Sequence, residues 1–426
     1  MKLDLELVKI EDIEFGSKTS ISKDVLIVDR EELKSLLETD TNFAEVNIDL
    51  AKPGESTRII NVVDVVEPRV KISGGVDFPG ALEKFGSAGR GTTRALKGIS
   101  VVFCDSHPHW LHSKSLIDMD GVGAELGRYG KMPNIVIGPV PKGNIAEFEY
   151  ARSVKVAGLR AATYLARAAK KEQIFDTETY ELDPKKKRIN DLPKIAYFYQ
   201  VYSPQHDPRG IPDPIFYGHP ISTTLPLVVH PNEIIDGGIL SGYTIRMMET
   251  YSIQNHPIIM ELYRRHEKNL NFVGVVFGVS SMESARRPLA AMMVGNIISD
   301  TLGANGVIMT KALGGAPTVD LGEAAVECER LGVKTCLLLQ ILNTETFLNS
   351  EAMFSSRDLN ALINTGVIFG KARLPVLHKV IGGFPDTPVF NDTKKQVAGE
   401  AIEVEQRFIC GCLSQIGASR MKAVQY

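Results

Sequence analysis

Three histidines within six residues form the densest group of potential metal ligands in the chain. They lie in the run Cys104-Asp-Ser-His107-Pro-His109-Trp-Leu-His112, which follows a β-branched stretch at residues 99–103. Alternate side chains of an extended segment point the same way, so His107 and His109 share a side, and a bend at Pro108 or Leu111 would add His112. Imidazoles suit zinc or iron. The run therefore predicts a metal site, although it is also typical of a surface loop at a strand end.

A second group of polar residues occupies the segment 203–219, after a predicted strand at 194–201. It contains His206-Asp-Pro-Arg209 and Tyr217-Gly-His219. A histidine can transfer a proton and an arginine can bind a carboxylate. We therefore take His206 and His219 as candidate catalytic residues and Arg209 as a candidate substrate-binding residue; a proline-rich covering loop is the alternative interpretation.

A third candidate site is the loop Gly314-Gly315-Ala-Pro-Thr318-Val-Asp320, which leads directly into a predicted helix. Thr318 is a suitable N-cap. Free backbone N–H groups at a helix start suit a carboxylate or a phosphate. We predict that Gly314, Gly315, Thr318 and Asp320 bind substrate, with a simple Gly-Pro turn as the alternative.

The elements that must position these residues divide the chain into two kinds of pattern. Residues 1–150 are β-rich: 45–50 alternate with the strand period, and 58–66 and 98–103 are β-branched runs. Residues 145–171 have helical spacing and continue into a polar stretch at 170–192 that is typical of a linker. The helical stripe consists of Ala151, Val154, Ala157, Ala161 and Leu165.

Beyond the linker, strands at 194–201, 272–279, 306–310, 335–341 and 366–369 alternate with helices at 284–302 and 319–331. This alternation predicts a parallel sheet flanked by helices, with ligand loops at the carboxyl ends of its strands. The expected fold class is α/β, with a β-rich N-terminal domain (1–150), a helix and polar linker (151–192) and an α/β domain (193–426).

Composition excludes several classes of protein. The chain has 426 residues, 44% hydrophobic and 23% charged, with a formal net charge of −3. A weakly acidic chain offers no long-range attraction for nucleic acid or an anionic membrane surface. The N-terminus lacks a signal-peptide pattern, and the five cysteines are odd in number. We therefore expect a cytoplasmic protein with no nucleic-acid or membrane partner.

Several stretches together resemble the α/β-proprotein subunit of component B of the glycine/sarcosine/betaine reductases. They run in order through nearly the whole chain, which also has the length of that subunit. The stretches are Leu50-Ala-Lys-Pro-Gly-Glu-Ser-Thr-Arg58, Asp64-Val-Val-Glu-Pro-Arg-Val-Lys71, Phe78-Pro-Gly80, Leu96-Lys-Gly98, Ile117-Asp-Met-Asp-Gly-Val-Gly-Ala-Glu125, Asp191-Leu-Pro-Lys-Ile-Ala-Tyr197, Asp236-Gly-Gly-Ile-Leu-Ser-Gly242, Glu261-Leu-Tyr-Arg-Arg-His266, Leu270-Asn-Phe-Val-Gly274 and the terminal Tyr426.

The resemblance implies a self-cleaving segment, Ser-Gly-Asn-Cys, whose cysteine becomes a pyruvoyl group that binds the substrate amine. Here the corresponding segment is Ser241-Gly-Tyr243-Thr244. Cleavage before Thr244 would yield a ketobutyryl group, and only cleavage between Leu240 and Ser241 would yield a pyruvoyl group. We therefore expect no pyruvoyl group of the family's kind, and we keep Ser241 and Thr244 as candidate catalytic residues.

The resemblance further implies an oxidoreductase subunit that cleaves the C–N (or C–S) bond of a small amino-acid-like substrate, reductively or by elimination. It also implies a partner subunit that carries a thiol or a selenol, so we expect a homo-oligomer or a complex with a second reductase subunit. Two alternatives remain. One is a non-catalytic scaffold or binding subunit, and the other is a metal-dependent lyase or hydrolase that uses the cluster of His107, His109 and His112.

Overall fold

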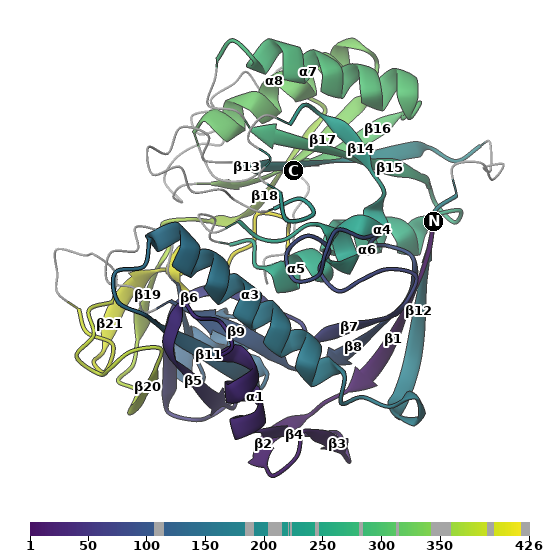
Figure 1. Cartoon of the computed structure of the whole chain (residues 1–426). Helices are drawn as coiled ribbons and strands as arrows, with labels where there is room; N and C mark the ends of the chain where they lie inside the picture. Colours follow the sequence, from purple (N-terminus) through teal and green to yellow (C-terminus); the bar gives the residue numbers. More distant parts are fainter. Residues whose placement is uncertain are drawn as a thin grey trace.

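The protein is seen here as a computed structural model that describes residues 1–105, 115–183, 191–202, 215–219, 221, 224–242, 247–280, 284–311, 315–341, 359–389 and 396–418. The N-terminal sheets lie below a separate α/β sheet, with short helices between the two (Figure 1). These helices are α4 (Pro231–Glu233), α5 (Thr250–Gln254) and α6 (Pro257–Arg265). The expected α/β class, with a strand-rich N-terminal part and a later parallel sheet, is confirmed.

Two sheets make up most of the N-terminal part. One has the strand order β12-β1-β8-β7 and the other the order β10-β6-β9-β11-β5. The alternation predicted at 45–50 is present at residues 45–48, where Val46 and Ile48 are buried and Glu45 and Asn47 are exposed. The strands are β1 (Lys2–Lys9), β5 (Phe43–Ala51), β6 (Thr57–Val66), β7 (Arg69–Ser73), β8 (Gly91–Lys97), β9 (Ser100–Cys104), β10 (Ser115–Asp118), β11 (Asn134–Pro141) and β12 (Ile174–Glu181).

Smaller elements close the lower end of this part. Strands β2 (Asp12–Gly16), β3 (Ser20–Ser22) and β4 (Val25–Asp29) form a three-stranded sheet. Helix α1 (Arg30–Leu37) follows directly, and the Asp29 carboxylate caps it by accepting a hydrogen bond from the N–H of Glu32 at 3.0 Å. Helix α2 (Gly121–Leu126) and a 3₁₀ turn (Tyr129–Lys131) follow β10.

The predicted Ala-rich helix is α3 (Glu147–Ala166), which packs on β9 and its neighbours. Its stripe of Ala151, Val154, Ala157, Ala161 and Leu165 is buried. Gly158 allows the close approach to the sheet, because a Cβ atom at this position would lie 2.1 Å from the Phe103 ring. The helix is therefore held rigidly against the end of β9.

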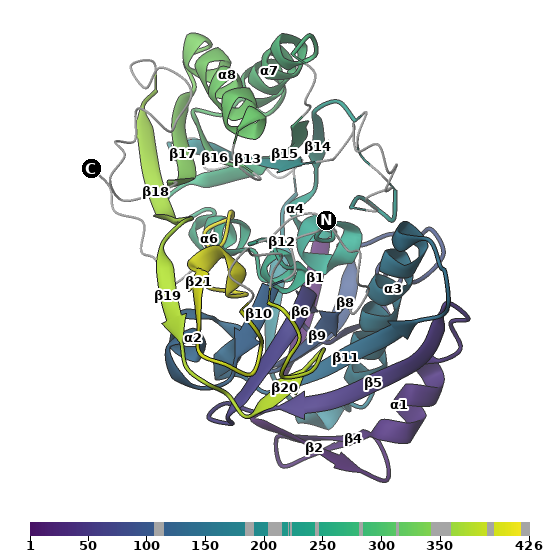
Figure 2. The ribbon, with the colours of Figure 1, turned by 90° about the vertical axis from the view of Figure 1, so that its left-hand side faces the viewer.

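Two segments of the chain form strands that the sequence analysis did not predict. The polar stretch at 170–192 contains β12, which pairs antiparallel with β1 along the sheet edge, so its exposed face is polar and only Tyr180 is buried. Strand β20 (Lys379–Ile381) pairs with the first residues of β6. It lies along the same edge of β6 at which β9 pairs with the later residues of that strand. The two-stranded antiparallel sheet of β19 (Lys371–Leu374) and β21 (Ile402–Glu405) also lies beside the N-terminal sheets (Figure 2). The domain division at 150 and 192 stays a prediction.

The upper sheet has the order β14-β15-β13-β16-β17-β18. Neighbours from β15 to β18 are parallel, and β14 is an antiparallel edge strand. Helices α7 (Arg287–Asn296) and α8 (Ala316–Arg330) cover one face (Figure 2). The strands are β13 (Lys194–Tyr202), β14 (Leu227–Val229), β15 (Asn271–Ser280), β16 (Gly306–Thr310), β17 (Lys334–Ile341) and β18 (Ala361–Val367), the last beginning earlier than the predicted 366–369.

No helix within the described ranges combines the length and the hydrophobicity needed to cross a lipid bilayer.

A buried histidine lies in the core on the other face of this sheet. His256 has no exposed surface, and its Nε2 atom lies 3.1 Å from the Tyr197 hydroxyl. The imidazole ring also makes edge contacts with the rings of Tyr197 and Tyr199. Burial lowers the pKa of His256 to about 3, so the folded protein keeps this imidazole neutral.

We expect the unfolded state to take up a proton at His256 below its ordinary pKa of about 6.5, whereas the folded state takes it up only near pH 3. Stability from this residue is therefore complete above pH 6.5 and is lost as the pH falls toward 3, at up to about 1.4 kcal/mol per pH unit. Thermal melts from pH 7 to pH 4 should show a smaller loss of stability in His256→Phe than in the wild type. Parallel curves for the two proteins would contradict this assignment.

Candidate active site

A buried lysine on α3 contacts Ser241, one of the candidate catalytic residues. Lys155 is 4% exposed and lies in the same helix stripe as Ala151 and Val154. Its ammonium group donates a hydrogen bond to the carbonyl oxygen of Ser241 and lies 3.3 Å from the Asp64 carboxylate. A buried ammonium group costs several kcal/mol unless it is paired. The Lys155–Asp64 pair is therefore a built feature of this region.

Asp64 connects the lysine to the other side of Ser241. This carboxylate on β6 is 4% exposed and accepts hydrogen bonds from the Thr250 N–H (2.8 Å) and the Thr250 hydroxyl (2.6 Å). The Ser241 N–H in turn donates to the Thr250 hydroxyl oxygen at 3.1 Å. The backbone of Ser241 is thus held at its N–H by Thr250 and at its carbonyl by Lys155, and Asp64 orients both groups. We call Lys155, Asp64 and Thr250 the backbone clamp.

A small pocket adjoins the backbone clamp. It is lined by Asp64, Lys155, Gly242, the Phe103 ring and Asp105, which follows β9. Two carboxylates, one ammonium group and an aromatic ring therefore lie around one space. Such a set can bind both charges of a zwitterion, and the ammonium group can stabilise negative charge that develops on an oxygen atom.

The chain before Ser241 is fixed by a second buried carboxylate. Asp236 accepts hydrogen bonds from the Thr93 hydroxyl (2.6 Å), the Gly89 N–H (2.6 Å) and the Lys71 ammonium group. The next residue, Gly237, has φ of +87°, and a Cβ atom there would lie 2.9 Å from the Phe78 ring. The Asp-Gly-Gly sequence therefore anchors this segment to β7 and β8 before it reaches the backbone clamp.

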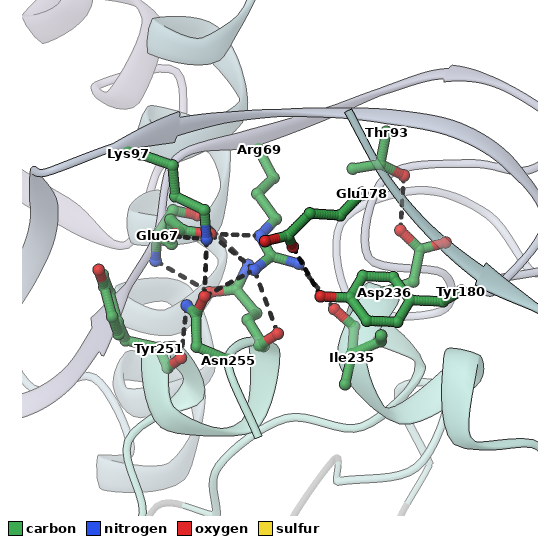
Figure 3. A network of polar contacts seen from close by, with 11 residues as sticks. Glu67, Arg69, Thr93, Lys97, Glu178, Tyr180, Ile235, Asp236, Tyr251 and Asn255 are labelled. Atoms are coloured by element: carbon green, nitrogen blue, oxygen red, sulfur yellow. Dashed lines mark hydrogen bonds and ion pairs between the residues drawn. The ribbon is translucent and has the colours of Figure 1, made fainter. Parts of the chain in front are cut away.

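A charged network contacts the chain on both sides of Ser241 (Figure 3). Glu67 pairs with Arg69 (2.7 Å) and with Lys97 (2.9 Å), and both cations also contact the side chain of Asn255. Arg69 further donates to the carbonyl oxygen of Ile235 at 2.9 Å. Burial alone would raise the pKa of Glu67, but Lys97 and Arg69 lower it to about 2. The network ties both ends of residues 235–255 to the same strands.

Two buried cysteines near Glu249 are poor candidates for a nucleophile. Cys410 donates to the buried Glu249 carboxyl group at 3.3 Å, and burial raises the pKa of both groups. Burial likewise raises the pKa of Cys412 to about 11. Thiols with raised pKa values are poor nucleophiles at neutral pH. Glu249 follows the clamp segment closely, and its carboxyl group also accepts a hydrogen bond from the N–H of Gly411 at 3.3 Å.

The structure brings one predicted catalytic residue into this centre. Ser241 is 2% exposed and forms its core. His219 is exposed, in a turn where Phe216 pairs with both His219 and Ile239. The remaining predicted residues of these groups lie outside the described residues: Thr244, His206, Arg209, Gly314 and the proposed metal ligands His107, His109 and His112. Within the described ranges, no group of three or more His, Cys, Asp or Glu side chains is placed to hold a metal ion.

The predicted substrate loop starts its helix earlier than expected. Helix α8 begins at Ala316 with Gly315 as its N-cap, so Thr318 lies inside the first turn and is not the cap. Pro317 explains the difference, because proline is favoured in the first turn, where its missing N–H is not needed. Thr318 is buried, while Gly315 is exposed. Asp320 pairs with Arg287 and accepts a hydrogen bond from the Ser280 hydroxyl at 2.6 Å.

The family model described as "Glycine/sarcosine/betaine reductase component B subunits" matches residues 1–424. The chain belongs to this family. The resemblance seen in the sequence is thereby confirmed.

The relatives that this chain resembles carry the names of three reductases. The chain is 32% identical to "Glycine reductase complex component B subunits alpha and beta" of Acetoanaerobium sticklandii, over 100% of both chains. It is 32% identical to "Sarcosine reductase complex component B subunit alpha" and 30% identical to "Betaine reductase complex component B subunit alpha", both of Peptoclostridium acidaminophilum. These two cover 90% of this chain and 89% and 88% of the relatives. No solved structure matches the chain.

The sequence analysis missed the backbone clamp of this component B subunit. One signal was present: Lys155 follows Ala151 by four residues and so interrupts an otherwise apolar helix stripe. Asp64 likewise interrupts the β-branched run of β6. An ionisable residue on a buried face needs a partner. Sequence patterns could have indicated that both are buried, but not that they meet.

Proposed function

We propose that this component B subunit activates a small amino-acid-like substrate for cleavage of its C–N (or C–S) bond at the backbone clamp. The observation that supports this most directly is the buried Lys155–Asp64 pair, which grips Ser241 in the segment corresponding to the family's cleavage site. A scaffold subunit has no need to keep a buried charge pair there, since an apolar pair would be as stable. We further propose that the subunit works in the cytoplasm, in a homo-oligomer or with a second reductase subunit.

The charges around the pocket suggest how a substrate is oriented. The substrate carboxylate lies against Lys155, and its cationic nitrogen or sulfur lies toward Asp64 and Asp105. A thiolate or selenolate of the partner subunit attacks the α-carbon, and the amine (or thioether) leaves with the bonding electron pair as a neutral molecule. Lys155 offsets the repulsion between the two anions. The contribution of this chain is therefore orientation and electrostatic stabilisation.

The residues of this segment do not fit the family's pyruvoyl group. Thr244 occupies the cysteine position, and threonine cannot yield a pyruvoyl group. Ser241 could yield one only by attack on the Leu240 carbonyl carbon. Instead its hydroxyl donates to the carbonyl oxygen of Gly242 at 3.3 Å, on the opposite side of the residue. We therefore propose that the subunit acts without a pyruvoyl group and derive no step through one.

We expect the purified protein to be one uncut polypeptide. Intact-mass analysis should give the full-length mass, 46.7 kDa, with no fragments that end between residues 240 and 244. Borohydride, which reduces a protein-bound carbonyl group, should leave both the mass and the activity unchanged. Activity is assayed on glycine, sarcosine and betaine with the thiol or selenol partner from the native host.

Two fragments, or a borohydride mass increase, would show that the chain does form a carbonyl group. A lack of turnover of every amino-acid substrate in the complete complex would instead favour the scaffold alternative. The two results concern different parts of the proposal and are read separately.

A further inference from the structure

The upper sheet has a topological switch point, which lies outside the candidate active site. In chain order, β13 comes first, β15 is placed on one side of it, and β16, β17 and β18 follow on the other side. Chain connections therefore leave the carboxyl ends of β13 and β16 in opposite directions. In open sheets of this order, small molecules bind in the crevice at that point.

A buried carboxamide, that of Gln200, lies beside the switch point. Gln200 on β13 is 2% exposed, and its Oε1 atom accepts no hydrogen bond in the part of the chain that the structure describes. Leaving a buried acceptor unsatisfied costs about 1–3 kcal/mol. Phe198, two residues earlier, packs with α7 and α8, so Gln200 faces the same helices. A ligand that donates a hydrogen bond would remove this cost.

Gln200 lines a pocket between the sheet and these helices. The polar residues of the lining include Arg287 and Asp320, which pair with each other, and its apolar walls combine Gly278 and Ala290 with the larger Phe198 and Val294. Arg287 is 18% exposed and Asp320 12% at their side chains, so both charges are largely withdrawn from water. The pocket thus offers one cation, one anion and one carboxamide within apolar walls.

We propose that this pocket binds a small free α-amino acid as a zwitterion, at a site separate from the backbone clamp. The ligand carboxylate pairs with Arg287, and its ammonium group donates to Gln200 Oε1 and to Asp320. The apolar walls then contact the carbon atoms of the ligand. This site goes beyond the proposed reaction, because it lies in the other part of the chain and does not depend on Lys155.

The test uses the full-length chain without partner or reductant. Isothermal titration and thermal shift are measured with glycine and alanine, and with acetate and ethanolamine, each of which lacks one of the two charges. We expect stabilisation by the amino acids that grows with the logarithm of their concentration, and little by the one-charge probes. Gln200→Leu should weaken amino-acid binding about 10- to 100-fold, as expected for loss of a hydrogen bond to a charged group.

Stability without ligand separates a binding role from a structural one. Since Gln200→Leu removes an unsatisfied buried polar atom, the ligand-free variant should melt at or above the wild-type temperature. Because the backbone clamp is itself proposed to hold an amino acid, the titrations are repeated in Lys155→Met, which should lose binding at the clamp and keep it at this pocket. The proposal is overturned if Lys155→Met binds no amino acid, as when the pocket holds only water, or if Lys155→Met/Gln200→Leu binds amino acids as Lys155→Met does.

Discussion

Replacing Lys155 by methionine is expected to lower the turnover of the reductase complex by about 10²–10³-fold, the usual cost of removing one preorganised charged donor. Methionine is one atom shorter than lysine and keeps an unbranched apolar stem, so the packing of α3 on β9 should be retained. What is lost is the ammonium group that contacts the Ser241 carbonyl and the Asp64 carboxylate. The rate is measured in the assembled complex under saturating substrate.

A stability effect has to be separated from a catalytic one. Lys155→Met leaves Asp64 buried without its cation, so the double variant Lys155→Met/Asp64→Asn serves as a charge-neutral reference that should recover stability but not activity. Arg152→Met, on the exposed side of the same helix, is the matched control and should have wild-type activity. Full activity of a folded Lys155→Met protein would remove the backbone clamp from the mechanism.

The largest effect on stability is expected at Arg58. This side chain has no exposed surface and forms two hydrogen bonds with Asp118, at 2.7 and 2.9 Å. It also donates to the carbonyl oxygens of Pro375, Ala398 and Glu400, each at 2.9 Å. One guanidinium group thus fastens the returning C-terminal segment to β6. Arg58→Leu should lower the free energy of unfolding by about 3–5 kcal/mol, since it leaves Asp118 buried and unpaired.

Denaturant unfolding with a matched exposed arginine provides the comparison. The side chain of Arg373 is 91% exposed and lies 4.0 Å from Glu403, so Arg373→Leu should change stability by less than about 0.5 kcal/mol. Arg58→Leu/Asp118→Leu should recover part of the loss, because neither charge then remains buried. Limited proteolysis should cut Arg58→Leu first between residues 375 and 400. Equal denaturation midpoints for Arg58→Leu and Arg373→Leu would contradict the anchoring role.

Local patterns predicted most of the regular elements. The β-branched runs became β6 and β9, and the alanine stripe became α3, because period and propensity are properties of neighbouring residues. Strand β12 was missed because one face of an edge strand can be entirely polar, which locally resembles a linker. Pairing of β20 with β6 joins residues more than 300 positions apart, and no local pattern reports such a contact.

The sequence by itself determined the family, through motifs that run in order along the chain. Thr244 at the position expected for the cysteine predicts that the family's pyruvoyl group is missing, which intact-mass analysis tests. Only the tertiary structure decided what surrounds Ser241. Lys155 lies 86 positions before Ser241, and Asp64 lies on a different element from both. Burying two opposite charges is favourable only when they meet, and they meet because α3, β6 and the segment 235–255 pack around one core.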